Sequence, residues 1–219
     1  SGDAYIDHPA FGPAVIGRIL EAEGYRVAIV PQPNWRDDLR DFTKLGKPRL
    51  FFAVSAGAMD SMVNHYTANL RLRSNDAYTP GGKAGFRPDR AIDTYTKILK
   101  RLYPHTPVVV GGIEASLRRL THYDYWSDKL QRSVLATSGA DLLIYGMGDK
   151  PIREVAKSLR NGFNMKLLRG LRQVGFLADK EYVERLYNGK TIVLNTFEEC
   201  AQDKHKFGEN FCHIEQLSN

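Results

Sequence analysis

Short apolar runs alternate with amphipathic segments along the first 162 residues. Four runs rich in β-branched or aromatic residues predict strands, at residues 26–30, 49–54, 107–110 and 141–145. Apolar residues at helical spacing predict helices over residues 13–24, 37–46, 89–103, 126–139 and 150–162. Continuous apolar strands separated by amphipathic helices are typical of a parallel sheet covered on both faces. The sequence therefore predicts an α/β fold with a doubly wound parallel sheet of the flavodoxin or Rossmann kind.

A first strand is expected before the opening stretch "SGDAYIDHPAFG", which has the character of a loop leading into the first predicted helix. That strand is absent or reduced to a stub at Ala4–Ile6. The first strand of a doubly wound sheet is central, so its loss would be costly. We therefore expect the sequence to be a piece of a longer chain, with its upstream strand cut away or unrecorded.

Residues 56–88 are too long for an ordinary connection in such folds, which takes about 2–6 residues. The segment carries several cations and a Pro80-Gly81-Gly82 turn. Two interpretations stay open, a loose surface excursion and an insertion at the ligand-binding edge of the sheet. If it is a docking insertion, we expect it to be mobile in the domain alone, with Arg71, Arg73 and Arg87 exposed and lacking buried partners.

The alternation ends after Gly162. A short helix over residues 178–189 precedes an extended piece at 190–195, and Thr196 with Glu199 forms a capping-box pattern. No second core is predicted in this part. We divide the chain into an α/β domain at residues 1–162 and a C-terminal helical arm at residues 163–219.

The predicted strand ends carry residues that leave room for a ligand. Parallel strands bring their carboxyl ends to one crevice, and glycines there expose backbone N–H groups to a flat or phosphorylated molecule. The residues predicted to bind a cofactor are Asp7, His8, Gly12, Ser55, Gly57, Gly111, Gly112, Glu114, Ser116, Gly146 and Gly148. Glu114 could also act as a general base, but no partner at catalytic spacing is visible. No catalytic residue is therefore assigned.

The net charge of +6 is concentrated in residues 150–172, which contain seven cations and one anion, Glu154. The cations of the first half lie on the outward face of a predicted helix. A solvated helix face is the simpler interpretation, and a surface for RNA or an acidic partner is the alternative. No apolar run approaches the roughly 18–20 residues that a membrane span needs, and only two cysteines occur. We expect a soluble cytoplasmic protein.

Three stretches resemble the N-terminal region of the YgiQ-like radical SAM proteins: "DAYIDHPAFGPAVIGRILEAEGYRVAIVPQPNW", "VVVGGIEASLRRLTHYDYWSD" and "LLIYGMGDKPIREVAKSL". The likeness covers essentially the whole chain, including the tail "NTFEECAQDKHKF". This region is similar to the cobalamin-binding-type domain that precedes the radical SAM barrel in many such enzymes. The resemblance implies that Gly111-Gly112 and Gly146–Asp149 border a cobalamin crevice, with Asp149 where Glu is usual.

The resemblance also implies a [4Fe–4S] cluster, held by a Cys-x3-Cys-x2-Cys triad, that binds and cleaves S-adenosylmethionine. Cys200 and Cys212 have eleven residues between them and no third partner, so neither matches that triad. We interpret both as structural thiols. The cluster and S-adenosylmethionine are therefore expected downstream, in the barrel of the same polypeptide, and no cofactor and no metal site are expected in this chain.

Cobalamin is not expected here either. Base-off cobalamin proteins use Asp-x-His-x-x-Gly after the first strand, whereas this sequence has His8 directly after Asp7 and a proline next. We expect loop hydrogen bonding from these two residues in place of cobalt ligation.

Two functions are carried forward. The first is an accessory domain of a radical SAM enzyme of unknown substrate, and the alternative is a stand-alone RNA- or nucleotide-binding module. The aromatic stretch "HYDYW" at residues 122–126 could stack on bases or a corrin, but it is more typical of a core.

Overall fold

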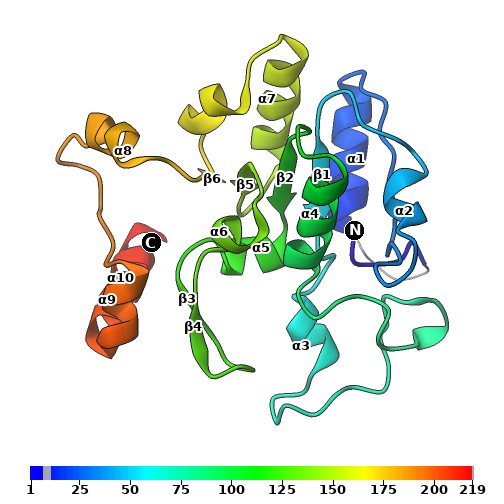
Figure 1. Cartoon of the computed structure of the whole chain (residues 1–219), viewed down its shortest axis with the longest axis horizontal. Coiled ribbons are helices and arrows are strands. Elements are labelled where there is room, and N and C mark those ends of the chain that lie inside the picture. Colours follow the sequence, from blue (N-terminus) through cyan, green and yellow to red (C-terminus); the bar gives the residue numbers. More distant parts are fainter. Residues whose placement is uncertain (7–10, 219) are drawn as a thin grey trace.

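The computed structural model describes residues 1–6 and 11–218, built around a four-stranded sheet in the order β1-β2-β5-β6 (Figure 1). These strands are β1 (Phe52–Ser55), β2 (Val108–Gly111), β5 (Leu142–Ile144) and β6 (Val174–Gly175). The pairs β1–β2 and β2–β5 are parallel, and β6 runs antiparallel to β5. The predicted α/β fold with a mostly parallel sheet is confirmed.

Helices cover both faces of this sheet. On one face, α4 (Ala91–Leu102), α5 (Ile113–Leu117) and α6 (Val134–Ser138) pack against Val108 and Val110 of β2. On the other face, α1 (Phe11–Ala22) and α7 (Asp149–Arg160) pack against Val109 of β2. Successive side chains of a strand point to opposite faces, so β2 contributes to two separate cores. This is the double winding that the sequence predicted.

Local signals in the sequence explain where several helices begin and end. Gly24 follows α1 with a φ of +81°, a left-handed conformation that glycine adopts without strain. Asp60 begins α3 (Ser61–His65) by accepting hydrogen bonds from the backbone N–H groups of Met62 and Val63. Ser133 caps α6 in the same way through the Leu135 N–H.

Two predicted elements are wrong. Residues 26–30 form no strand, because no neighbouring strand pairs with them among residues 1–6 and 11–218. The helix predicted over 126–139 is instead a hairpin of β3 (His122–Asp124) and β4 (Lys129–Gln131), followed by the short α6. The hairpin turn places Asp128 at a φ of +52° and is held by a hydrogen bond from the Tyr123 hydroxyl to Asp128. A positive φ ends any helix at that point.

Residues 56–88 form an excursion below the sheet that contains α3 and the 3-10 turn η1 (Pro80–Gly82) (Figure 1). Whether this excursion is mobile in the domain alone stays a prediction. Two isolated bridges, Tyr66 with Leu72 and Asn75 with Lys83, tie the excursion together. Arg71 and Arg73 are exposed, as predicted. The same prediction is wrong for Arg87, which is only 1% exposed and has buried partners.

The remaining elements are α2 (Arg40–Thr43) and five that follow α7, namely η2 (Met165–Gly170), β6, α8 (Lys180–Leu186), α9 (Phe197–Gln202) and α10 (Lys204–Ser218). In Figure 1, α8, α9 and α10 lie to one side of the sheet, as an arm. β6 and the buried Leu168 belong to the sheet and its core, although they lie beyond residue 162. The division of the chain at Gly162 stays a prediction. In the described part of the chain, every helix is too short or too polar to cross a lipid bilayer.

The predicted capping box at the start of α9 is present. The Thr196 hydroxyl accepts from the Glu199 N–H, and the Glu199 carboxylate accepts from the Thr196 N–H. These bonds, foremost the one from the Thr196 N–H, and an ion pair with Lys206 lower the pKa of Glu199 to about 2.

Because this pKa is depressed in the folded chain, the capping box stabilises α9 above the ordinary pKa of 4.5 and loses that contribution as pH falls toward about 2. We predict that the Glu199 carboxyl titrates well below pH 4, measured by its side-chain ¹³C chemical shift. Glu199→Gln keeps an acceptor for the Thr196 N–H and is the matched control, in which the amide protection of α9 no longer depends on pH in this range. Titration of Glu199 near its ordinary pKa would contradict the prediction.

Candidate functional site

The carboxyl ends of β1, β2 and β5 lie in register, with Ser55 beside Gly111 and Gly111 beside Ile144. The loops that follow therefore meet at one edge, as predicted. A Cβ on Gly112 would stand 2.9 Å from the Ser55 Oγ. The Ser116 Oγ accepts a hydrogen bond of 3.2 Å from the Gly146 N–H. These contacts join the ends of three strands, while Gly112 and Gly146 themselves stay exposed.

The other predicted residues are placed less uniformly. A Cβ on Gly111 would stand 3.3 Å from the Ile144 carbonyl oxygen, and a Cβ on Gly148 would stand 3.4 Å from the Ile144 Cγ2. Gly12 is in the first turn of α1, with open space around it. Asp7 and His8 lie outside the described residues. Whether the strand ends bind a ligand stays a prediction.

Gly57 has a clear structural task. Its φ is +113°, and a Cβ there would lie 2.1 Å from a carboxylate oxygen of Asp3. The Asp3 carboxylate accepts a hydrogen bond of 2.7 Å from the Ala58 N–H in the same loop. Only glycine lets the Asp3 side chain enter this position. The space above Gly57 is therefore filled by the protein itself.

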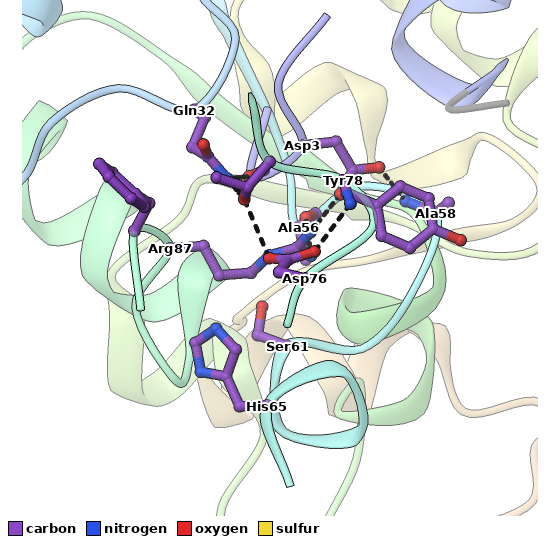
Figure 2. Close-up of polar contacts among 12 residues, drawn as sticks. Asp3, Gln32, Ala56, Ala58, Ser61, His65, Asp76, Tyr78 and Arg87 are labelled. Atoms are coloured by element: carbon purple, nitrogen blue, oxygen red, sulfur yellow. Dashed lines mark hydrogen bonds and ion pairs between the residues drawn. The ribbon is translucent and has the colours of Figure 1, made fainter. Parts of the chain in front are cut away.

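Arg87 lies at the centre of a buried charge network below this edge (Figure 2). Its guanidinium donates to Asp3 at 2.5 Å and to the Ala56 carbonyl oxygen at 3.0 Å, and its Nε lies 3.6 Å from Asp76. All three charged side chains are at most 1% exposed. Burial raises the pKa of Asp3, and the neighbouring Arg87 opposes that rise. The guanidinium ties the N-terminal loop, the end of β1 and the 56–88 excursion to one point.

Glu114 is also buried, and it faces the protein interior. Its two carboxylate oxygens accept hydrogen bonds of 2.9 Å from the backbone N–H groups of Ser61 and Ile92, in the first turns of α3 and α4. Burial raises the pKa of Glu114, and the hydrogen bonds from Ser61 and Ile92 oppose that rise. With both oxygens engaged by the backbone, Glu114 joins two helices to the sheet edge. A role of Glu114 in binding a cofactor stays a prediction.

Further ion pairs surround this centre. Arg118 donates to Asp60, the residue that caps α3, and Arg90 donates to Asp124 at 2.5 Å. Asp124 is buried, and its contacts with Ser127 and Arg90 outweigh burial and lower its pKa. Most of these partners were missed by sequence reasoning. The N-cap role of Asp60 could have been found, because an aspartate directly before a helical segment is a local signal.

The chemistry available at this edge is limited by this pairing. Within the described residues, the buried acids Asp3, Asp60, Asp76 and Glu114 hold arginines or backbone N–H groups. In the described ranges, no cluster of His, Cys, Asp or Glu could hold a metal ion. Cys200 is buried and Cys212 exposed, and they cannot supply the three thiolates of a cluster that leaves one iron open. A pocket of about 390 Å³ lies beside the edge, lined by Ala4, Tyr5, Ile6, Pro31, Gln32, Thr79, Pro80 and Phe86. None of the predicted ligand-binding residues that the structure describes lines it.

Comparison with known proteins gives a consistent picture. The family model described as "Radical SAM N-terminal" matches residues 1–219. A UPF0313 protein of Porphyromonas gingivalis is 62% identical to the chain, covering 100% of it and 34% of the relative. A UPF0313 protein of Bacteroides thetaiotaomicron is 59% identical over 100% of the chain and 37% of that relative. A third, from Geobacter sulfurreducens, is 50% identical over 100% of the chain and 36% of its own length. The chain thus spans about a third of the length of the curated relatives it matches. No solved structure matches it.

The buried network predicts a large effect of removing Arg87. Arg87→Met would leave Asp3 and Asp76 buried without a cation, and we expect the free energy of unfolding to fall by about 3–5 kcal/mol. Arg71→Met is the matched control, because Arg71 is exposed in the same excursion, and its effect should stay within about 0.5 kcal/mol. Urea denaturation followed by fluorescence measures both. Similar small effects for the two variants would show that the network is not a structural centre.

Proposed function

Because the chain belongs to the radical SAM N-terminal family, we propose that it is the accessory N-terminal domain of a radical SAM enzyme. About two thirds of the length of its curated relatives lies outside the matched region. We place the [4Fe–4S] cluster and the S-adenosylmethionine site in that part, in a barrel downstream in the same polypeptide. The task of residues 1–219 is then to cover or position that barrel.

The cysteines carry this assignment. Only two occur among the 219 residues, whereas the family's cluster needs three thiolates. Cys200 is 1% exposed and lies inside the arm, where the Asn210 side chain donates to its Sγ at 3.3 Å. Burial raises the pKa of this thiol, which disfavours the thiolate that binds iron. Cys212 is exposed on α10, with no second cysteine beside it in the described residues. Both support a catalytic centre elsewhere in the polypeptide.

A surface for the barrel is available at the carboxyl edge of the sheet. Large apolar side chains are exposed there directly after two strand ends, with Ile113 45%, Leu117 56% and Met147 78% exposed. Tyr123 and Tyr125, predicted to be core residues, are half exposed on the adjacent hairpin, so that prediction is wrong. We call Ile113, Leu117, Tyr123, Tyr125 and Met147 the apolar edge.

The strand-end residues would contribute to this interface. Gly112 and Gly146 are exposed and directly precede Ile113 and Met147 in the sequence, so a barrel docked on the apolar edge would cover them. We propose that they present backbone to a ligand held between the two domains, as glycines at strand ends do in related folds. Cobalamin is not part of this proposal, because His8 directly follows Asp7 and so departs from the Asp-x-His-x-x-Gly spacing of base-off cobalamin proteins.

RNA binding is the second candidate. Lys150 and Lys157 are exposed on α7, on the outward face predicted from the sequence. Two other cations of this stretch have partners in the domain, since Arg153 pairs with Glu23 at 3.6 Å and Arg160 lies over the Tyr25 ring. The partial internal pairing favours an ordinary helix surface. A cytoplasmic location is expected for either function.

We predict that the full-length protein in which Cys200 and Cys212 are both replaced by alanine still binds about four irons per chain after anaerobic reconstitution. The cluster would then be held by other cysteines, and the visible absorption of the variant would match that of the unaltered protein. Loss of iron in the double variant would place the cluster in residues 1–219 and overturn the assignment. If the unaltered full-length protein binds no cluster, the result would favour the RNA-binding function over the radical SAM assignment.

The apolar edge makes a second prediction. In the full-length protein, Leu117→Asp should lower the melting temperature by the equivalent of more than about 1 kcal/mol, because it places a charge in the interdomain contact. Leu177→Asp is the matched control, since Leu177 is 53% exposed beyond β6, away from the apolar edge. In residues 1–219 alone both variants should be nearly neutral. Equal effects of Leu117→Asp with and without the downstream region would show that the barrel docks elsewhere.

A further inference from the structure

Ser1 and Gly2 make hydrogen bonds on two opposite sides, in the pattern of a parallel strand. The Ser1 nitrogen donates to the Val30 carbonyl oxygen at 3.0 Å, and the Gln32 N–H donates to the Ser1 carbonyl oxygen at 2.8 Å. This pair of bonds is the parallel-ladder pattern that joins Ser1 to Pro31. The Gly2 N–H points the other way and donates to the Ser55 carbonyl oxygen at 2.9 Å. Two residues thus bridge the end of β1 and the end of the 26–30 segment.

Beyond these two residues, β1 has an open edge. The Phe52 N–H donates to the Pro107 carbonyl oxygen, on the side of β1 that faces β2. Successive N–H groups of a strand point to opposite sides, so those of Ala53 and Ser55 point away from β2. Residues 1–6 and 11–218 offer these two groups no acceptor. The Ala53 side chain is exposed, although its counterpart Val109 in β2 is buried. The unpaired N–H groups of an edge strand can pair with a further strand, and the sequence of β1 is apolar enough to be covered by one.

Residues 26–30 are open in the same way. The sequence of this segment is that of a strand, yet Ala28 and Ile29 are exposed, and the Ala28 and Val30 N–H groups have no acceptor in the described residues. One face of the segment already packs, since the Ile29 and Val27 side chains lie 3.4 Å and 3.7 Å from where a Cβ on Gly17 of α1 would be. The segment is therefore held against α1 and has a free edge toward β1.

We propose that one more strand, parallel to β1, lies between β1 and residues 26–30, and that the polypeptide directly before Ser1 supplies it. The bonds of Ser1 and Gly2 already have the spacing of the last residues of such a strand. A strand from another molecule could not be continuous with them. The strand would have apolar side chains on both faces and no proline, because it would be central.

The added strand would complete the sheet in the order 26–30, new strand, β1, β2, β5, β6. The direction in which the chain winds then reverses between the new strand and β1. Ligands of doubly wound sheets bind at such a reversal, outside the carboxyl ends. In this protein, Asp3 follows the new strand and Gly57 follows β1, so the reversal coincides with the buried contact between Asp3 and Arg87. This inference depends on the hydrogen bonds alone and is independent of the proposed enzyme chemistry.

The register follows from the pairing of Ser1 with Pro31. Parallel strands advance together, so the second residue of the new strand before Ser1 lies opposite Ile29 and the fourth lies opposite Val27. The Ala28 and Val30 N–H groups would then donate to the new strand, whereas the Val27 and Ile29 N–H groups would face outward. On the other side, the Ala53 and Ser55 N–H groups would donate to the new strand.

Hydrogen exchange of the full-length protein, read at single amides by mass spectrometry, tests this register. We expect the Ala28, Val30, Ala53 and Ser55 amides to exchange at least about tenfold more slowly than the Val27 and Ile29 amides. In the same protein shortened to begin at Ser1, the four amides should exchange rapidly, while those of Val109 and Val110 in β2 stay protected.

The alternation of slowly and rapidly exchanging amides along residues 27–30 of the full-length protein tests the proposed strand even if the shortened protein fails to fold. Rapid exchange of Ala28 and Val30, or protection of Val27 and Ile29 in their place, would overturn the strand. Protection that survives the shortening would overturn its assignment to the preceding polypeptide. A second copy of the chain would then reveal itself because the protection would depend on protein concentration.

Discussion

The buried contact between Arg87 and Asp3 is the interaction on which this domain depends. A guanidinium and two carboxylates without solvent are stable only when every charge is paired and hydrogen bonded. Here the pairing draws together three parts of the chain, the loop after residue 2, the end of β1 and the 56–88 excursion. The excursion is long, and this network fixes it to the sheet together with the contacts of Glu114 with Ser61 and of Arg118 with Asp60.

The strand-end glycines have a different meaning once this network is known. Glycines at the carboxyl edge of a parallel sheet suggest a ligand, and the chain has them at Gly57, Gly112 and Gly146. At Gly57 the space that glycine leaves is taken by the Asp3 carboxylate, and at Gly112 it adjoins the Ser55 hydroxyl. The same residue type thus serves packing at one strand end and leaves open backbone at the next.

The sequence predicted what is decided by nearby residues. Apolar runs located β1, β2 and β5 to within a few residues, and the Thr196–Glu199 pattern identified a real capping box. Arg87 was misjudged because its Asp3 partner is 84 residues away in the sequence, so no local pattern indicates burial. The hairpin at 122–131 was misjudged because its turn depends on Asp128 at a positive φ, which favours glycine and gives no signal here. The 26–30 segment has the composition of a strand, and composition alone does not supply a neighbour.

The separation between Asp3 and Arg87 also has a consequence for synthesis on the ribosome. Chains grow at about 5–20 residues per second, so the 84 residues between the partners take roughly 4–17 s to add. During that interval the Asp3 carboxylate stays hydrated and the end of β1 has nothing to hold it. β2, which pairs with β1, emerges later still. The contact between Asp3 and Arg87 can therefore form only after this interval, and the pairing of β1 with β2 only after a longer one.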